Sequence, residues 1–286
     1  MVRKKILVTG GAGYVGTSLL PKLLEDGHEV TVFDNLMQGG NQLLSFFKNK
    51  NFHFVKGDIT IKNDLKEVVK GKDNLIEVSD SSQVILYGST GSNYGKVTDI
   101  CTEETPLNPL SLYGETKTLG EQMLLERGNV IAYRFATAFG VSPRLRLDLL
   151  INDFTNKCLR DGYLVVYEKH FMRTFIHVSD MGESFRFAID NLDNMIDNVY
   201  NVGSSNMNYS KEEICNIISD KTNAFIHFEE IGEDADKRNY VVSYDKINKL
   251  GFETKIGIHE GIDEIIKVLK VVDFRNPYVN TQPGIK

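Results

Sequence analysis

The sequence is short of three features, and each shortage excludes a class of protein. It has only 3 cysteines in 286 residues, Cys101, Cys158 and Cys215. Their odd number and wide separation argue against disulfides and against a metal site, so we expect free thiols and no metal. It has no run of about 18 apolar residues, the length that a membrane-spanning helix needs. It has no excess of basic residues, since the formal net charge is -6, and this gives no support to nucleic-acid binding.

The first residues also lack the apolar stretch of a signal peptide. Arg3, Lys4 and Lys5 lead directly into a β-branched run. We therefore expect a cytoplasmic protein without a membrane partner. With 41% hydrophobic and 25% charged residues, the chain has the composition of a globular enzyme and room for two modest regions around a shared core.

The chain does have a glycine-rich turn between an apolar run and a helical pattern. Residues 4–9 predict a buried parallel strand, and Gly10, Gly13 and Gly16 follow it. In this context glycines let the backbone approach a pyrophosphate at a helix N-terminus, where unpaired N–H groups favour anionic oxygens. A second predicted strand ends at Asp34, whose carboxylate can bind ribose hydroxyls and repel a 2′-phosphate. The pattern predicts a dinucleotide site that prefers NAD to NADP.

A second motif, Tyr113-Gly114-Glu115-Thr116-Lys117, opens another predicted helix. Residues four apart share one face of a helix, so Tyr113 and Lys117 can point into the same site. There an ammonium can stabilise a phenolate for proton transfer. A Tyr–Lys pair at this spacing is common by chance, but behind a dinucleotide motif it indicates hydride chemistry.

Six motifs follow one another along the chain: Thr9 to Gly16, Asp34-Asn35, Gly57-Asp58, Tyr113 to Lys117, Arg134 to Gly140 and Arg173 to Asp180. In this order they resemble the extended short-chain dehydrogenase/reductases, in the NAD-dependent epimerase/dehydratase branch that acts on nucleotide sugars. Members like UDP-glucose 4-epimerase and GDP-heptose 4-dehydrogenase are the most similar. The resemblance implies an α/β fold, with a doubly wound parallel Rossmann sheet and a smaller C-terminal α/β region.

The same resemblance implies how the chain is divided. Residues 1–141 and 173–198 would bind NAD, residues 142–172 and 199–272 would bind the nucleotide sugar, and residues 273–286 would form a tail. The sugar would carry a UDP or GDP group. A homodimer through the helix that bears Tyr113 is usual in the family.

Individual roles also come from the resemblance. Thr90, Tyr113 and Lys117 would be catalytic, with Thr90 bonding the reacting sugar oxygen while Tyr113 takes its proton. NAD would be contacted by Gly10, Gly13, Tyr14, Val15, Gly16, Asp34, Asn35, Asp58, Ile59, Tyr113 and Lys117, and the nucleotide sugar by Thr137, Arg144, Arg173 and Arg238. Thr137 stands where many relatives have Asn. Arg144 and Arg238 could equally be solvated surface residues, because guanidinium groups are normally exposed.

Two departures from the family pattern bear on function. The 4,6-dehydratases carry an Asp-Glu pair directly after the catalytic Thr, whereas this chain has Gly91-Ser92. This favours oxidation or epimerisation at C4 over dehydration. In addition, the family has a strand and most of a helix between Asp58 and the strand that begins at Gln83, and this chain has no room for both, since such a unit takes roughly 30 residues.

The shortened segment is compatible with several arrangements of the strands at the centre of the sheet. We interpret Asn74 to Val78 as the end of the family's helix, with a central strand missing. The strand from Gln83 could then move beside the first strand, or the sheet could keep unpaired backbone groups, each costing about 1 to 3 kcal/mol. The sequence therefore supports two functions: an NAD-dependent nucleotide-sugar oxidoreductase or epimerase, or a catalytically impaired relative that keeps nucleotide or partner binding.

Overall fold

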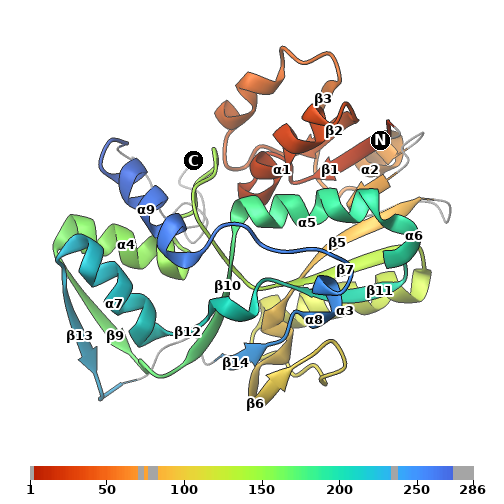
Figure 1. Cartoon of the computed structure of the whole chain (residues 1–286). Helices are drawn as coiled ribbons and strands as arrows, with labels where there is room; N and C mark the ends of the chain where they lie inside the picture. The colour runs from red at the N-terminus through yellow and green to blue at the C-terminus, as the bar shows by residue number, and fades with distance from the viewer. Residues whose placement is uncertain (1–2, 70–73, 77–82, 233–237, 273–286) are drawn as a thin grey trace.

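A seven-stranded parallel sheet forms the centre of the molecule, in the order β11-β7-β5-β4-β1-β2-β3 (Figure 1). The computed structural model describes residues 3–69, 74–76, 83–232 and 238–272. Neighbouring strands of this sheet all run parallel. Its strands are β1 (Lys5–Thr9), β2 (Glu29–Asp34), β3 (Phe52–Lys56), β4 (Asn74–Ile76), β5 (Val84–Thr90), β7 (Val130–Phe135) and β11 (Asn198–Val202).

Helices cover both faces of the sheet, so the predicted doubly wound fold is confirmed. On one face α1 (Tyr14–Glu25) packs against α5 (Val178–Asp190), which α6 (Leu192–Met195) follows. The opposite face carries α2 (Lys62–Val69) and α3 (Leu112–Arg127). Most β-branched and aromatic residues of the strands are buried between these layers, as a parallel sheet covered on both sides requires.

The central strand β4 corrects the prediction made from the sequence. Asn74–Ile76 forms a strand that pairs with β1 along three residue pairs and with β5 along two. The prediction of a missing central strand is therefore wrong, and so is the interpretation of residues 74–76 as the end of a helix. Three residues are enough to give the facing backbone groups of β1 and β5 hydrogen-bonding partners. Only seven residues, 77 to 83, separate β4 from β5, so a helix of the family's length has no place between them.

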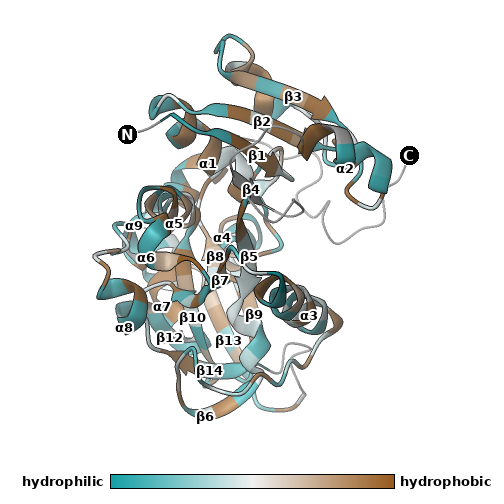
Figure 2. Cartoon of the chain, turned by 90° about the vertical axis from the view of Figure 1, so that its right-hand side faces the viewer, coloured by the Kyte–Doolittle hydropathy of each residue, from teal (hydrophilic) through white to brown (hydrophobic). Residues whose placement is uncertain are grey.

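The second region gathers beside the large sheet around its own apolar core, which includes Ile151, Ile214 and Ile262 (Figure 1). A two-stranded parallel sheet, β9 with β13, flanks its helices, as Figure 2 shows in the lower part of the view. Its elements are α4 (Leu150–Asp161), β9 (Tyr163–Tyr167), α7 (Lys211–Thr222), β13 (Phe225–Glu229) and α9 (Ile258–Leu269).

Short elements connect the two regions. β8 (Thr137–Phe139), β10 (Met172–His177) and β12 (Asn208–Ser210) form a three-stranded sheet, and β6 (Lys96–Cys101) pairs with β14 (Asn239–Val242). Outside this connection, α8 (Asp245–Asn248) packs on β11 and the 3-10 helix η1 (Asn41–Phe46) packs on α1. The other described 3-10 helices are η2 (Gly91–Tyr94) and η3 (Ser205–Met207).

One predicted boundary differs from the structure. Residues 199–202 belong to β11, which pairs with β7 and so extends the large sheet rather than the second region. The predicted tail, residues 273–286, lies outside the described residues. Within the described part of the chain, no helix is both long and apolar enough to cross a membrane.

Candidate functional site

A cavity of about 1010 Å³ lies at the carboxyl ends of β1, β5 and β7. This is the edge of a doubly wound sheet at which ligands bind, and the volume is at the upper end of the usual range for ligand pockets. The cavity brings together 12 of the predicted site residues: Gly10, Gly13, Tyr14, Val15, Gly16, Ile59, Thr90, Tyr113, Lys117, Thr137, Arg144 and Arg238.

Two glycines of the turn between β1 and α1, Gly13 and Gly16, have no space for a side chain. A Cβ on Gly16 would lie 2.6 Å from the Cα of Gly11, and one on Gly13 would lie 2.9 Å from the carbonyl oxygen of Gly10. Gly10 itself has a φ of 65°, a left-handed conformation that favours glycine. The backbone is therefore exposed to the cavity just where α1 begins at Tyr14 and its first N–H groups are unpaired. This geometry fits a pyrophosphate.

Asp34 ends β2 and is tied to the glycine turn. Its carboxylate accepts the backbone N–H of Ala12 at 3.0 Å and that of Leu36 at 2.8 Å. These bonds hold the carboxylate beside the turn, in the position from which it can receive ribose hydroxyls. Asp34 is not among the residues that line the cavity itself.

Asn35 and Asp58 meet beside Asp34, at the ends of neighbouring strands. The Asn35 amide donates to the Asp58 carboxylate at 3.3 Å, and Thr60 donates to it through its backbone N–H and its hydroxyl. The Thr60 and Asn35 bonds lower the pKa of Asp58, so it is an anion at neutral pH. Neither residue lines the cavity.

The three predicted catalytic residues come from two elements. Thr90 ends β5 and is 8% exposed, while Tyr113 and Lys117 lie one turn apart on α3. Ser111 is the N-cap residue of α3, and its hydroxyl accepts the backbone N–H of Gly114. Lys117 donates from Nζ to the carbonyl oxygen of Gly88 at 2.9 Å, which ties α3 to β5. Tyr113 is 56% exposed on the cavity side.

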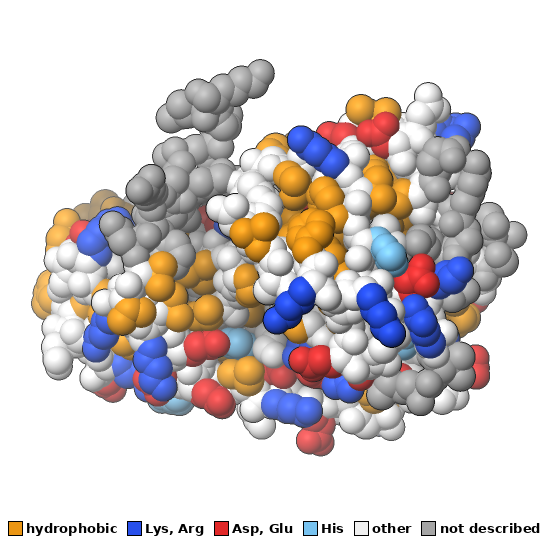
Figure 3. Space-filling model, turned by 90° about the horizontal axis from the view of Figure 1, so that it is seen from above, with side chains coloured by type: hydrophobic (Ala, Val, Ile, Leu, Met, Phe, Trp, Pro, Cys, Tyr) orange, Lys and Arg blue, Asp and Glu red, His pale blue; other side chains and the backbone are white. Residues whose placement is uncertain are grey.

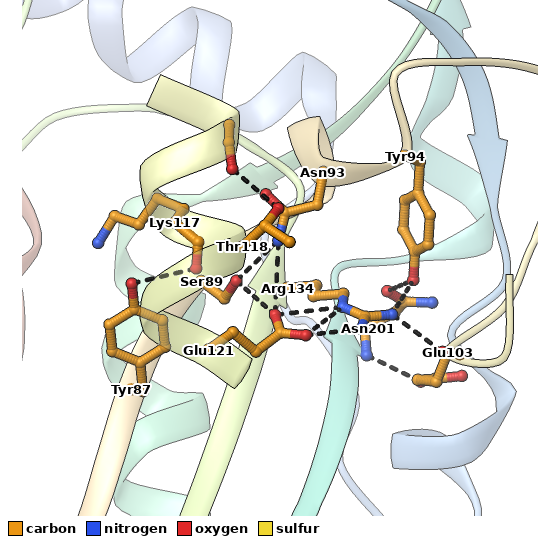
Figure 4. A network of polar contacts seen from close by, with 11 residues as sticks. Tyr87, Ser89, Asn93, Tyr94, Glu103, Lys117, Thr118, Glu121, Arg134 and Asn201 are labelled. Carbon is orange, nitrogen blue, oxygen red and sulfur yellow. Dashed lines mark hydrogen bonds and ion pairs between the residues drawn. The ribbon is translucent and has the colours of Figure 1, made fainter. Parts of the chain in front are cut away.

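A buried polar network lies behind these residues, and the sequence did not reveal it (Figure 4). Glu121 of α3 is 1% exposed and accepts from Arg134 of β7 at 2.6 Å and from the Ser89 hydroxyl at 2.6 Å. Arg134 also donates to the Tyr94 hydroxyl at 3.1 Å. The network therefore joins α3, β5, η2 and β7. Its one signal in the sequence is that Glu121 stands four residues after Lys117, on the same face of the helix.

The predicted substrate residues lie in different surroundings. Thr137 lines the cavity, and its buried Oγ1 has no hydrogen-bond partner among the described residues. Arg144 also lines the cavity and donates to the Gln38 side chain at 3.1 Å. Burial, and to a smaller extent the charge of Arg146, lowers the pKa of Arg144. Arg238 donates to the hydroxyl of Ser92, the second residue of η2.

Arg173 does not reach the cavity wall. It is 1% exposed, and its guanidinium donates to the backbone carbonyl oxygens of Met172 and Arg238. Arg173 therefore lies behind Arg238, and this position differs from the predicted one, in which Arg173 would contact a diphosphate in the cavity. Both β10, which carries Arg173, and the segment at Arg238 belong to the connection between the two regions.

Among the described residues, positive charge predominates on the cavity wall. Lys117, Arg144, Arg146 and Arg238 line it, and Asp148 is the one carboxylate that the described residues contribute to its lining. Asp148 accepts from Arg146 at 2.6 Å. Elsewhere basic and acidic side chains are interspersed, as on the described residues of the face in Figure 3. In a chain of net charge -6, this is a local site for an anionic ligand.

Comparison with known proteins places this cavity in context. A family model described as the NAD dependent epimerase/dehydratase family matches residues 6–74 and 66–203. UDP-glucuronic acid decarboxylase 1 of Arabidopsis thaliana is 28% identical over 322 aligned residues, with 99% of this chain and 72% of that protein covered. A putative UDP-glucose 4-epimerase of Methanocaldococcus jannaschii is 26% identical, with 93% and 98% covered.

Solved structures share the fold. UDP-glucuronic acid 4-epimerase from Bacillus cereus, in complex with UDP-glucuronic acid and NAD, superposes with a TM-score of 0.80. The two sequences are 21% identical, and the superposition covers 93% of this chain and 99% of that one.

Proposed function

Since this chain belongs to the NAD-dependent epimerase/dehydratase family, we propose that it oxidises the C4 alcohol of a nucleotide-activated sugar, using NAD. The ketone is then released, or hydride returns to its opposite face and gives the epimer. One observation carries the proposal: Thr90, Tyr113 and Lys117 share a cavity with the glycine turn and three arginines.

The glycine turn and Asp34 would hold the dinucleotide, which, when bound, accepts the hydride from C4 and can give it back. Tyr113 takes the proton of the C4 hydroxyl as the C–H bond breaks, and Thr90 hydrogen-bonds the same oxygen. Lys117 has three N–H donors, of which one is bound to Gly88. The others are available for the ribose hydroxyls and for the phenolate that Tyr113 forms.

The arginines of the cavity would neutralise the diphosphate of the substrate. Arg144 and Arg238 come from the segments that face the glycine turn, so a nucleotide sugar would lie between the two regions with its sugar toward Tyr113. Guanidinium groups suit this role because they bind phosphate oxygens in pairs. The nucleotide is UDP or GDP in this proposal.

Dehydration at C5 and C6 is not proposed, because Gly91 and Ser92 offer no acid where the dehydratases carry one. The alternative function is that of an impaired relative that binds a nucleotide or a partner without catalysis. The argument for it was a central sheet with a missing strand, and it loses support because β4 connects β1 with β5.

The direct test is turnover of UDP-glucuronic acid, UDP-glucose and GDP-mannose by the purified chain. Formation of NADH is followed by absorbance, and epimers, ketones or decarboxylated sugars are identified by chromatography and mass. We expect conversion of at least one of the three. Binding of NAD and of a nucleotide sugar without any conversion would support the alternative instead.

The cofactor gives a second expected result. We expect the protein purified without added cofactor and then denatured to release NAD rather than NADP, at close to one per chain. Gly16→Ala should empty the site, because the new Cβ would lie 2.6 Å from Gly11. Gly257→Ala is the matched control, since a Cβ there meets nothing within 4 Å. Release of NADP, or equal NAD content in both variants, would contradict the assignment of this turn.

The exposed face of α3 gives a third expectation. Leu112, Leu119 and Met123 recur on one side of the helix and are 75%, 58% and 70% exposed. We expect a homodimer through this face, and we expect Leu119→Glu with Met123→Glu to yield a monomer in sedimentation experiments. Phe225→Glu with Ile231→Glu is the control, because these equally exposed side chains lie elsewhere. A wild-type monomer would exclude this interface.

A further inference from the structure

Residues 140–149, which we call the arginine segment, connect β8 with α4 and bring Arg144 to the cavity wall. The segment begins at Gly140, whose φ of 102° favours glycine. A Cβ at this position would overlap the ring of His177, the last residue of β10. The first residue of the arginine segment therefore lies directly against the end of β10.

Asn152, in the first turn of α4, holds the arginine segment at two points. It is fully buried. Its Oδ1 accepts the backbone N–H of Gly140 at 3.0 Å, and its Nδ2 donates to the carbonyl oxygen of Arg146 at 2.8 Å. The second N–H of Nδ2 is shared between the Gly140 carbonyl oxygen at 3.3 Å and the Tyr14 hydroxyl at 3.4 Å. Arg144 thus lies on a short loop whose two ends are bound to one buried amide.

Tyr14 connects the same segment to the glycine turn, because it is the first residue of α1 and is 6% exposed. Its hydroxyl donates to the carbonyl oxygen of Gly140 at 2.6 Å, and its own carbonyl oxygen accepts the Ser142 hydroxyl at 2.7 Å. A phenol has one proton, which is bound to Gly140 here, and the longer bond from Asn152 uses a lone pair of the same oxygen. Tyr14 therefore joins the turn that would hold the dinucleotide to the segment that carries Arg144.

We propose that Tyr14 and Asn152 are positioning residues for the nucleotide sugar, which hold the arginine segment so that Arg144 meets the diphosphate. This rests on the proposed function, in which Arg144 binds that diphosphate. The bonds at Gly140 and Arg146 lie on either side of Arg144 and fix its backbone before the substrate arrives. Binding then orders less of the chain, and the affinity for the diphosphate rises.

A double-mutant cycle on Tyr14 and Arg144 tests this proposal. Isothermal titration calorimetry with UDP and with GDP, on protein supplied with NAD, gives the Kd of each nucleotide without any turnover. We expect Tyr14→Phe to raise the Kd of the nucleotide that binds about threefold to tenfold, the effect of one hydrogen bond. Arg144→Met should raise it about tenfold to a hundredfold, since a charged donor is lost. The double variant should stay within about twofold of Arg144→Met, because Tyr14 acts only through Arg144.

Asn152→Ala should act in the same direction as Tyr14→Phe and more strongly, because it releases both ends of the loop. Thermal unfolding shows whether this variant is folded at the temperature of the titration. Tyr14→Phe removes a single oxygen and keeps the ring, so it decides the proposal if Asn152→Ala does not fold.

Tyr133→Phe is the matched control for Tyr14→Phe. Tyr133 of β7 is also buried, and its hydroxyl donates to a backbone carbonyl oxygen, that of Ser184, at 2.9 Å. Tyr133 is not among the residues that line the cavity. The control should lose stability as Tyr14→Phe does, and it should keep the wild-type Kd.

Steady-state kinetics and cofactor content separate positioning from a general structural effect. With a nucleotide sugar that the wild-type protein converts, Tyr14→Phe should raise KM and leave kcat unchanged, because the diphosphate is bound equally in the ground state and the transition state. NAD content should stay at the wild-type level, since the hydroxyl that is removed points to Gly140 and the backbone N–H groups at the start of α1 are untouched.

The results that would overturn the proposal differ from one another. An unchanged Kd in Tyr14→Phe would refute the role of Tyr14 and leave the proposed function intact. Losses that multiply in the double variant would show that Tyr14 does not act through Arg144. Loss of NAD from Tyr14→Phe would place the effect in the glycine turn instead. A wild-type protein that binds neither UDP nor GDP would refute the substrate of the proposed function, and this inference with it.

Discussion

Tyr113→Phe should lower kcat by about 10²- to 10⁴-fold, the usual contribution of a positioned proton-transfer group. The substitution removes one oxygen from a side chain that is 56% exposed at the start of α3, so the fold should be retained. Lys117 keeps its bond to Gly88, and the glycine turn is untouched. We therefore expect the variant to release as much NAD as the wild-type protein.

Tyr163→Phe is the matched control for this variant. Tyr163 is 58% exposed, and it lies on β9 in the second region. The same chemical change there should leave kcat unchanged. Steady-state conversion of the nucleotide sugar measures both variants, and equal turnover in Tyr113→Phe and wild type would disprove the proton transfer proposed here.

Glu121→Gln should have the largest effect on stability. Glu121 and Arg134 form an ion pair at 2.6 Å whose side chains are 1% and 7% exposed (Figure 4). Removing one partner of a buried pair leaves the other charge uncompensated and costs about 3 to 5 kcal/mol. We expect thermal unfolding to begin on the order of 10 °C lower, and we expect activity to fall because α3 loses its ion pair with β7.

Glu212→Gln provides the comparison, because it removes the same charge from an exposed pair. Glu212 and Lys169 are 3.0 Å apart, with side chains 40% and 43% exposed. Such a pair contributes at most about 1 kcal/mol. A melting temperature of Glu121→Gln no lower than that of Glu212→Gln, measured by calorimetry, would show that the buried network does not stabilise the fold.

Local patterns were enough to predict the turn and the helix to which the proposed chemistry is assigned. Gly10, Gly13 and Gly16 are adjacent in sequence to the strand and helix that they join, so their spacing alone constrains the backbone. Tyr113 and Lys117 are placed by helical periodicity in the same way. The structure brings all five to one cavity.

Contacts between distant segments could not be predicted in this way. Arg173 was expected at the diphosphate, but its guanidinium meets the carbonyl of Arg238, 65 residues further along the chain. The Glu121–Arg134 pair joins a helix to a strand whose relative position only the packed sheet defines. Three residues of β4 are too few for a periodic pattern, and their strand conformation depends on β1 and β5 on either side.

The brevity of β4 also explains how the chain returns to begin β5. A parallel crossover must travel back along the length of the strand it leaves, and a strand of three residues is roughly 10 Å long. Seven residues can reach about 23 to 25 Å when extended. Seven residues are therefore long enough for the return that a strand of three residues requires. A short strand and a short connection go together here, because the length of the strand sets the distance that the connection must span.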